Sequence, residues 1–227
     1  MGLQHYTKWD YEVFPHLLCL GNSGSGKSYF LRQLVARISL NIPDAKAWIC
    51  DYKNEFMRPR EDARFYGYKS VLDGFNDYIS LFEERLHNNE NRLDDTQHEF
   101  RLLLIDEYIS WLNSLEKKEA EEIKKRMANL LFMARSLNMH IVLGCQRGMA
   151  ESFPFGSRDC LNVIFLGSPS RESIHSFCSS DEAAMMEPCE QGAGYIVFDG
   201  KPPAAITVPT VKDMGRLHAL LADIVTR

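Results

Sequence analysis

A glycine-rich segment holds the residues with the clearest chemical potential. Residues 21–28 read GNSGSGKS, which fits the spacing G-x-x-x-x-G-K-[ST]. Glycines let consecutive backbone N–H groups curl around an anionic phosphate at a helix N-terminus, where a Cβ would obstruct the approach. Lys27 would then reach the β and γ phosphates of a nucleotide, and the Ser28 hydroxyl would face Mg²⁺. The alternative is a Gly- and Ser-rich turn with a surface lysine.

The surroundings of this segment favour phosphate binding. The apolar residues 17–20 predict a short buried strand before it, and the residues from Tyr29 onward carry apolar side chains at helical spacing. A strand, a glycine loop and a helix therefore follow one another in the order that such a site needs. The residues expected to contact ATP are Gly21, Asn22, Ser23, Gly24, Ser25, Gly26, Lys27, Ser28 and Tyr29.

Two acidic residues end a second apolar run. Residues 102–105 are four successive apolar side chains, and Asp106 and Glu107 follow them. This pattern is typical of a strand buried on both faces of a parallel sheet, with the acids at its carboxyl end. Asp106 is predicted to bind the Mg²⁺ that Ser28 also binds, and Glu107 to polarise the water that attacks the γ-phosphate. The alternative is a strand that ends in a surface turn.

A glutamine follows a third apolar run. Residues 139–145 predict a buried strand, and Gln146 comes directly after it. A glutamine just past a central strand can reach the γ-phosphate and sense whether that group is still present. Only its position supports this role, so an ordinary polar strand end remains the alternative.

A sheet must bring these residues to one edge. Further strands are predicted at 45–51, 161–167, 194–198 and 204–208, and helices from Tyr29 onward and at 71–86, 116–137, 170–178 and 211–224. Segments 52–67 and 87–99 predict loops. Residues 1–13 predict an edge strand or a flap over a nucleotide base, with packing preferred for Tyr6 and Trp9. The alternation indicates an α/β fold, a RecA-like core with a mostly parallel sheet flanked by helices.

Composition narrows the class of protein. The 227 residues are 45% hydrophobic and 25% charged, as in ordinary globular proteins, and the net charge of -5 excludes a whole-molecule basic field for nucleic acid. The apolar runs fall short of the ~20 residues that cross a bilayer, and no basic stretch with an apolar run opens the chain. We therefore expect a cytoplasmic protein without direct membrane insertion. Six cysteines without a C-x-x-C pair predict reduced core thiols.

Beyond the phosphate loop, the chain resembles the FtsK/HerA superfamily of DNA-pumping ATPases, which is related to conjugative coupling and genome-packaging ATPases. The segments that carry the resemblance are FPHLL at 14–18, CDYKNE at 50–55, LLLIDE at 102–107, ARSLNMHIVLGCQR at 134–147, NVIF at 162–165, SRES at 170–173 and GAGY at 192–195. Two departures are Asn138, where the family usually has Gly, and Asn22-Ser23 in place of the commoner Thr-Thr. N-K-x-D and L-S-G-G-Q, which mark other nucleotide-binding classes, do not occur.

The resemblance implies further site residues and a domain organisation. Arg135 takes the place of the arginine supplied in trans to the ATP of a neighbouring subunit, Gln146 that of the γ-phosphate sensor, and Arg171 is a second candidate near that interface. The alternative for either arginine is a helix surface. The implied organisation is a single motor domain over 1–227, with its core at 14–200 and a C-terminal strand and helix at 201–227.

The implied function is a Mg²⁺-dependent ATPase that assembles as a ring, expected to be a hexamer, and moves DNA, expected to be double-stranded, for a phage, plasmid or other mobile element. A membrane, replication or transfer protein would anchor it. The basic residues that could line a DNA channel are Lys117, Lys118, Lys124, Lys125 and Arg126. A solvated helix explains them equally well. The alternative function is an ATP-dependent assembly or coupling module that docks a protein partner without moving DNA.

Overall fold

An eight-stranded sheet organises the part of the chain that the structure describes. The structure is a computed structural model that describes residues 8–56, 63–90 and 98–227. The strand order is β3-β2-β4-β5-β1-β6-β7-β8. From β3 through β6 in this order neighbouring strands pair in parallel, and β7 and β8 continue the sheet antiparallel. The predicted α/β class with a mostly parallel central sheet is confirmed.

The elements alternate along most of the chain. The strands are β1 (His16–Gly21), β2 (Lys46–Asp51), β3 (Phe65–Gly67), β4 (Arg101–Asp106), β5 (Met139–Cys145), β6 (Leu161–Leu166), β7 (Ala193–Val197) and β8 (Ala204–Thr207). The α-helices are α1 (Lys27–Asn41), α2 (Val71–Glu90), α3 (Tyr108–Leu112), α4 (Lys117–Met133), α5 (Arg171–His175), α6 (Ser180–Ala184) and α7 (Met214–Thr226). Short 3₁₀ helices are η1 (Tyr68–Ser70), η2 (Ala134–Leu137), η3 (Ala150–Ser152) and η4 (Pro154–Cys160).

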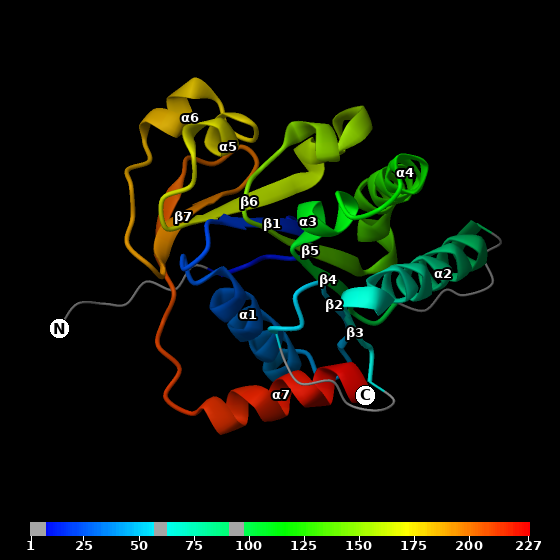
Figure 1. Cartoon of the computed structure of the whole chain (residues 1–227). Coiled ribbons are helices and arrows are strands. Elements are labelled where there is room, and N and C mark those ends of the chain that lie inside the picture. The colour runs from blue at the N-terminus through cyan, green and yellow to red at the C-terminus, as the bar shows by residue number, and fades with distance from the viewer. Residues whose placement is uncertain (1–7, 57–62, 91–97) are drawn as a thin grey trace.

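Helices cover both faces of the sheet (Figure 1). Successive side chains of a strand point to opposite faces. Leu18 and Leu20 of β1 therefore pack into the cluster that includes α2, α3 and α4, whereas Leu17 and Cys19 pack into the cluster that includes α1 and α7. Every residue of β1, β4 and β5 is buried. Burial on both faces explains why these strands are apolar runs without alternation.

Three of the six cysteines lie in the core. All six are free, and Cys19, Cys50 and Cys145 are buried in strands. Burial raises the pKa of the Cys145 thiol to about 12. The predicted core position is confirmed for these three residues.

Several element boundaries differ from the sequence-based expectation. The predicted loop at 52–67 contains the edge strand β3, which pairs with residues 49–51. Helix α2 runs on to Glu90 inside the predicted loop at 87–99, of which 91–97 lie outside the described residues. The short helix α3 was not predicted. The predicted helix at 116–137 is divided into α4 and the 3₁₀ helix η2.

The described part of the N-terminal segment, residues 8–13, packs at the end of the sheet opposite the glycine loop. Residues 11–13 form a turn, residues 8–10 belong to no helix or strand, and residues 1–7, including Tyr6, lie outside the described residues. The Trp9 ring lies edge-on to His140, near the start of β5, with centroids 6.1 Å apart. Its indole N–H donates to the Phe14 carbonyl oxygen at 2.6 Å. Because the glycine loop follows the carboxyl end of β1, Trp9 has the packing role.

We expect the fold to lose stability in mild acid through two buried histidines. Burial lowers the pKa of His16 to about 3 and the pKa of His140 to about 4. Both folded-state values lie below the ordinary value of 6.5, so the unfolded chain binds more protons than the folded chain as the pH falls through 6.5. The stability that these neutral rings contribute is present above pH 6.5 and is lost toward pH 4, by about 1.4 kcal/mol per pH unit for each ring.

Urea unfolding between pH 7.5 and pH 5 checks this expectation. The pH dependence of the free energy of unfolding should be weaker in the His16→Gln variant, because glutamine does not titrate. His218→Gln, at an exposed position on α7, is the control and should keep the slope of the unmodified chain. Equal slopes in His16→Gln and in the unmodified chain would contradict the assignment.

Candidate active site

The glycine loop joins the carboxyl end of β1 to the first turn of α1. Gly21 ends β1 and Lys27 begins α1. The loop is tightened by a hydrogen bond from the Ser25 backbone N–H to the Asn22 carbonyl oxygen, at 3.0 Å. Gly26 has φ +93°, a left-handed conformation that side chains with a Cβ rarely adopt. No side chain caps α1, so its first backbone N–H groups are left for an anion.

Neighbouring segments support the loop from outside. The Asn22 side-chain amide donates to the Ser168 carbonyl oxygen at 2.9 Å, and the Gly192 N–H donates to the Ser25 carbonyl oxygen at 2.9 Å. The Tyr29 hydroxyl accepts from the Val211 N–H at 2.7 Å. The Tyr29 ring therefore holds the C-terminal segment, which leaves its backbone amide as the group that could meet a phosphate. Ser23 and Gly24 are exposed at the tip of the loop.

The acid pair meets the loop where the sequence predicted it. The Lys27 ammonium forms ion pairs with the Asp106 carboxylate and with Glu107 Oε1, the latter at 3.0 Å. Ser28 Oγ donates to Asp106 Oδ2 at 2.9 Å. Gly144, on the neighbouring strand β5, makes room for this arrangement because a Cβ there would lie 2.4 Å from Asp106 Oδ1. Lys27, predicted to bind phosphate, and Asp106, predicted to bind a metal ion, thus lie in one small region.

These groups fit a Mg²⁺ ion bound together with a nucleotide. Mg²⁺ in nucleotide sites is usually held by one or two protein oxygens, by substrate phosphates and by water. Ser28 Oγ and Asp106 Oδ2 are such oxygens, and they lie 2.9 Å apart, close enough to bind the same ion. Within the described ranges no cluster of three or more His, Cys, Asp or Glu side chains could hold a metal by itself. The site therefore suits an ion that arrives with its phosphates.

Glu107 is held in a strained and crowded position. Its backbone is left-handed, with φ 66°, and its side chain is only 4% exposed. Gln146 Nε2 donates to Glu107 Oε1 at 3.3 Å, and Ser110 Oγ donates to Glu107 Oε2 at 3.2 Å. Lys53 Nζ lies 3.3 Å from Glu107 Oε1. The predicted general base and the predicted sensor are thus brought together.

The charges of the site depend on one another. Burial by itself would raise the pKa of Glu107, but Lys27 and then Lys53 more than offset it, so the pKa is lowered. Burial opposes the charge of Lys27, yet Asp106 and Glu107 raise the pKa of Lys27. Lys27 and Glu107 are therefore both ionised at neutral pH, as phosphate binding and general-base chemistry require.

Gln146 is placed by a turn that α5 supports. The Gly148 N–H, two residues after Gln146, donates to Ser173 Oγ at 3.0 Å. Ser170 caps α5 by accepting from the Ser173 N–H. Arg171 is the first residue of α5 and is exposed. Helix α5 follows the carboxyl end of β6, the same end of the sheet that carries the glycine loop.

Arg135 lies at the opposite end of the sheet. It belongs to η2, which precedes β5, whereas Gln146 follows β5. The seven residues of β5 span about 20 Å, so the Arg135 side chain is too far from the glycine loop of its own chain to reach a nucleotide there. The side chain is exposed.

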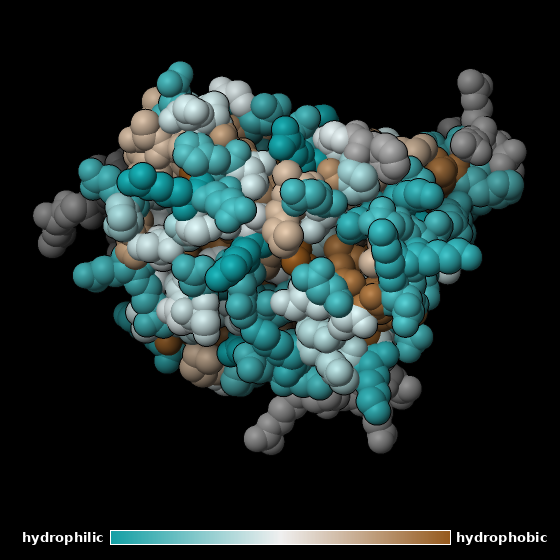
Figure 2. Space-filling model, turned by 45° about the horizontal axis from the view of Figure 1, so that its top comes forward, coloured by the Kyte–Doolittle hydropathy of each residue, from teal (hydrophilic) through white to brown (hydrophobic). Residues whose placement is uncertain are grey.

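The basic residues of α4 fall into two groups. Lys117, Lys118 and Lys125 are exposed. Lys124 pairs with Glu121 at 2.9 Å. Arg126 donates to Asn76 Oδ1 at 2.8 Å and lies over the Phe75 ring, so it packs α4 against α2. Figure 2 shows a face on which hydrophilic side chains predominate.

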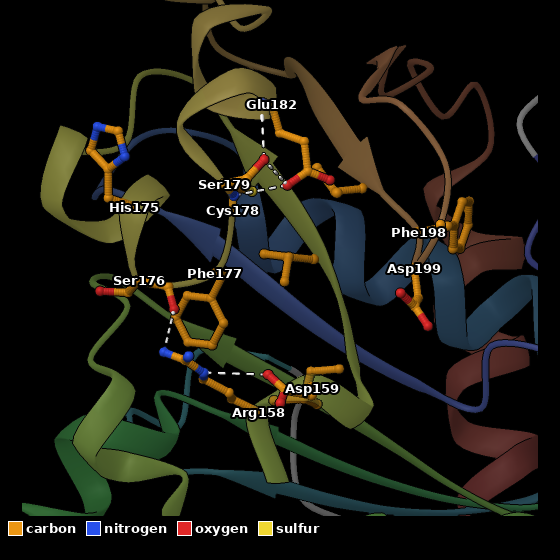
Figure 3. A pocket seen from close by; sticks show the side chains of 14 residues that line it. Arg158, Asp159, His175, Ser176, Phe177, Cys178, Ser179, Glu182, Phe198 and Asp199 are labelled. Atoms are coloured by element: carbon orange, nitrogen blue, oxygen red, sulfur yellow. Dashed lines mark hydrogen bonds and ion pairs between the residues drawn. The ribbon is translucent and has the colours of Figure 1, made fainter. Parts of the chain in front are cut away.

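A cavity lies apart from this site. It measures about 440 Å³ and lies between the sheet and the segments around α5 and α6 (Figure 3). Its lining includes Leu161, the first residue of β6, and Phe198, which follows β7. The glycine loop adjoins the other end of β6, because Gly21 pairs with Leu166. The cavity is therefore not where the glycine loop would hold a phosphate.

Sequence reasoning missed three contributors to the site. It included Lys53 only in a segment shared with a family, and it assigned no role to Ser110 or to the support that Gly192 gives the loop. The signal for Lys53 was its place two residues after a predicted strand, where the side chains of a parallel sheet converge.

The fold and the site together define a P-loop ATPase. The glycine loop, its lysine and serine, and an acid pair on a neighbouring strand are the parts that bind a nucleoside triphosphate and direct water to it.

Comparison with known families agrees with this class. The sequence model of the family described as "Helicase HerA, central domain" matches residues 6–143. This is more than half of the 227 residues, and the chain belongs to that family. The FtsK domain-containing protein YdcQ of Bacillus subtilis (strain 168) is 25% identical over 212 residues. That alignment covers 86% of this chain and 43% of YdcQ, so this chain spans less than half the length of that relative.

Solved structures share the fold at low sequence identity. The TcpA conjugation coupling protein of pCW3 matches with a TM-score of 0.74 and 16% identity, over 90% of this chain and 62% of that chain. The cytoplasmic domain of the Type VII secretion ATPase EccC of Thermomonospora curvata matches with a TM-score of 0.68 and 19% identity, over 94% and 28%. The genome-packaging NTPase B204 of Sulfolobus turreted icosahedral virus 2 matches with a TM-score of 0.58 and 14% identity, over 89% and 100%. In the described residues, no helix combines the length and the apolar character needed to cross a membrane.

Proposed function

We propose that this chain is a motor domain that hydrolyses ATP with Mg²⁺ in a ring, expected to be a hexamer, and drives double-stranded DNA through it. The observation that carries the proposal is that the candidate catalytic residues lie at two opposite ends of the sheet. Lys27, Asp106, Glu107 and Gln146 converge at one end, and Arg135 lies exposed at the other. An arginine that serves phosphoryl transfer from that position has to serve the ATP of another subunit.

Each site residue has a task in the proposed reaction. The loop N–H groups and Lys27 bind the phosphates, while Ser28 and Asp106 hold the Mg²⁺ that accompanies them. Glu107 takes a proton from the attacking water. Gln146, which contacts Glu107, senses whether the γ-phosphate is present. Arg135 of a neighbouring copy stabilises the charge on the transferred group, and Arg171, exposed on the edge that carries the loop, is a second contact near that interface.

The surface around Arg135 supports contact between copies. Phe132 and Met133, in the last turn of α4, are 50% and 42% exposed. Large apolar side chains exposed close together are typical of protein interfaces, and an arginine beside them is a common interface residue. A second copy of the chain that covers these side chains would bring Arg135 toward the ATP site of that second copy.

The DNA part of the proposal rests on relatives. TcpA is described as a conjugation coupling protein and B204 as a genome-packaging NTPase. The net charge of -5 means that contact with DNA would be local. The exposed lysines Lys117, Lys118 and Lys125 of α4 are the candidates.

A second candidate function has its own observation. EccC is described as a Type VII secretion ATPase, and one of its solved structures is described as a complex with a signal sequence peptide. A related role here would be an ATP-dependent assembly or coupling module that docks a protein partner. That module would hydrolyse ATP slowly, and DNA would not change its rate.

Two measurements on the full chain test the proposal. We expect duplex DNA at low salt to raise the ATPase rate and added salt to remove the increase, because phosphate contacts release counterions. We also expect the mass in solution to rise to that of a ring when an ATP analogue and DNA are both present. A rate indifferent to DNA would favour the coupling module, and a monomer that hydrolyses ATP at full rate would contradict the shared site.

A further inference from the structure

Asn138 closes the turn that carries Arg135. Its backbone N–H donates to the Arg135 carbonyl oxygen at 3.1 Å, and its φ of 51° lies in the left-handed region that favours glycine. Its side-chain Nδ2 donates to the His98 carbonyl oxygen at 2.7 Å, which orients the amide so that Oδ1 needs a different donor. The placement of Arg135 therefore depends on the groups that hold the Asn138 side chain.

His140 supplies the donor for that oxygen. Its Nε2 atom lies 2.8 Å from Asn138 Oδ1, and the residue is only 2% exposed, so water does not compete for the contact. Burial lowers the pKa of His140 to about 4, so the ring is neutral at pH 7 and carries one N–H. Its Nδ1 atom faces the Pro15 carbonyl oxygen at 3.2 Å, the longer of the two distances. We therefore assign the proton to Nε2, which donates to Asn138.

Aromatic rings hold the His140 ring in the orientation that this contact needs. Phe100, which precedes β4, stacks on it with ring centroids 4.3 Å apart. Tyr11 and Trp9 lie edge-on to it, with centroids 5.3 Å and 6.1 Å away. These rings would pack on a phenylalanine as they do on the imidazole. The packing of His140 and its hydrogen bond can therefore be separated by substitution.

We propose that His140 is a positioning residue for Arg135: its N–H holds Asn138, and Asn138 fixes the turn from which Arg135 reaches the ATP of a neighbouring copy. The inference rests on the proposed role of Arg135 between subunits. A group that acts on the transition state tolerates little displacement, since a shift of about 1 Å can cost about 10²-fold in rate. The glycine that the family usually has in place of Asn138 would offer no side-chain oxygen, so the restraint belongs to this chain.

Steady-state kinetics on the full chain test the positioning role. His140→Phe keeps a ring for the stacking but removes the N–H, and we expect kcat to fall roughly tenfold, as for a displacement smaller than about 1 Å. The KM for ATP should not change, because the groups assigned to ATP lie at the other end of the sheet. His140→Gln, whose amide can still donate to Asn138, should restore most of the rate.

His16→Gln is the matched control. His16 is also buried at this end of the sheet, where its Nδ1 atom accepts from the Ile141 N–H of β5 at 3.2 Å. We expect this variant to lose stability, as measured by its Tm, but to keep the kcat of the unmodified chain. A kcat that falls equally in His16→Gln and His140→Phe would show a general loss of stability and would overturn the positioning role.

A double-mutant cycle tests the contact itself. Asn138→Gly removes Oδ1 and keeps a backbone that adopts the left-handed conformation, so His140→Phe should lower kcat no further in that background. An equal decrease by His140→Phe in both backgrounds would mean that Asn138 does not transmit the effect, and the inference would fail.

Comparison with Arg135→Ala separates this inference from the proposed function. Full turnover by Arg135→Ala would contradict the shared site, and the inference would fail with it. Loss of turnover by Arg135→Ala but not by His140→Phe would overturn the positioning role alone. If both variants lose turnover, Glu107→Gln subunits should restore part of it to His140→Phe subunits, because the former carry an Arg135 that is held in place. Rings that mix without this recovery would also overturn the positioning role.

Discussion

Replacing Glu107 with glutamine is expected to slow ATP hydrolysis by about 10²- to 10⁴-fold and to leave ATP binding intact. Glutamine has nearly the same shape as glutamate but cannot take a proton from water. The affinity should persist because the groups assigned to the phosphates and the metal, namely the loop, Lys27, Ser28 and Asp106, keep their contacts with one another. Single-turnover hydrolysis and the binding of a fluorescent ATP analogue measure the two effects separately.

The surroundings of Glu107 make glutamine the informative substitution. Its carboxylate is buried beside two lysines, and a neutral amide of the same size still offers an oxygen to Lys27. Lys27→Ala should abolish tight nucleotide binding, but it also leaves Asp106 without the lysine that neutralises it. Removing one partner of a buried ion pair costs about 3–5 kcal/mol, so the Tm of Lys27→Ala has to be measured beside its affinity.

A matched control separates the reaction from the general effect of removing a negative charge. Glu122→Gln changes an exposed glutamate on α4 and should keep the full rate. Hydrolysis by Glu107→Gln at a rate close to that of Glu122→Gln would remove Glu107 from the role of general base.

The central strands and the glycine loop could be predicted because their sequence signals are local. The runs at 102–105 and 139–145 are apolar without alternation, which indicates strands buried on both faces, and the structure has them as β4 and β5. The glycine spacing at 21–28 is likewise complete within eight residues. In each case the residues that specify the element lie within that element.

The missed features depend on partners far along the chain. β3 is three residues long and is a strand because it pairs with β2, which no property of the charged segment 52–67 indicates. The contact of Lys53 with Glu107 joins the turn after β2 to the end of β4, and it exists because these two strands are neighbours in the sheet. Strand order is a property of the whole fold, so such contacts do not appear in a local pattern.

Asn138 shows how a departure from the pattern of a family is accommodated. It ends η2 with φ 51°, a left-handed conformation for which glycine is the usual residue. Asparagine tolerates this region better than most residues, because its short side chain can hydrogen-bond nearby. Here its amide donates to the His98 carbonyl oxygen at 2.7 Å, and its oxygen lies 2.8 Å from the Nε2 atom of His140. The turn that carries Arg135 is therefore held without glycine.

Replacing Arg135 with alanine is expected to lower ATP turnover by about 10³- to 10⁵-fold, with ATP binding unchanged. An arginine that stabilises charge on the transferred phosphoryl group acts mainly in the transition state, so its loss affects rate rather than ground-state affinity. Because Arg135 and the glycine loop lie at opposite ends of the sheet, we propose that the effect arises between subunits. Arg216→Ala, at an exposed position on α7, is the control for loss of a surface arginine.

Mixing two inactive variants tests the direction of that contact. Arg135→Ala subunits keep an intact Glu107, and Glu107→Gln subunits keep an intact Arg135, so a mixed ring contains some sites with both groups. We expect the mixture to recover part of the turnover that each variant lacks alone, with a maximum near equal proportions. Arginine acting in trans predicts this maximum, because only a site between unlike subunits receives both side chains. Rings that form and mix, as shown by their mass, but never recover turnover would exclude Arg135 as the residue supplied to the neighbour.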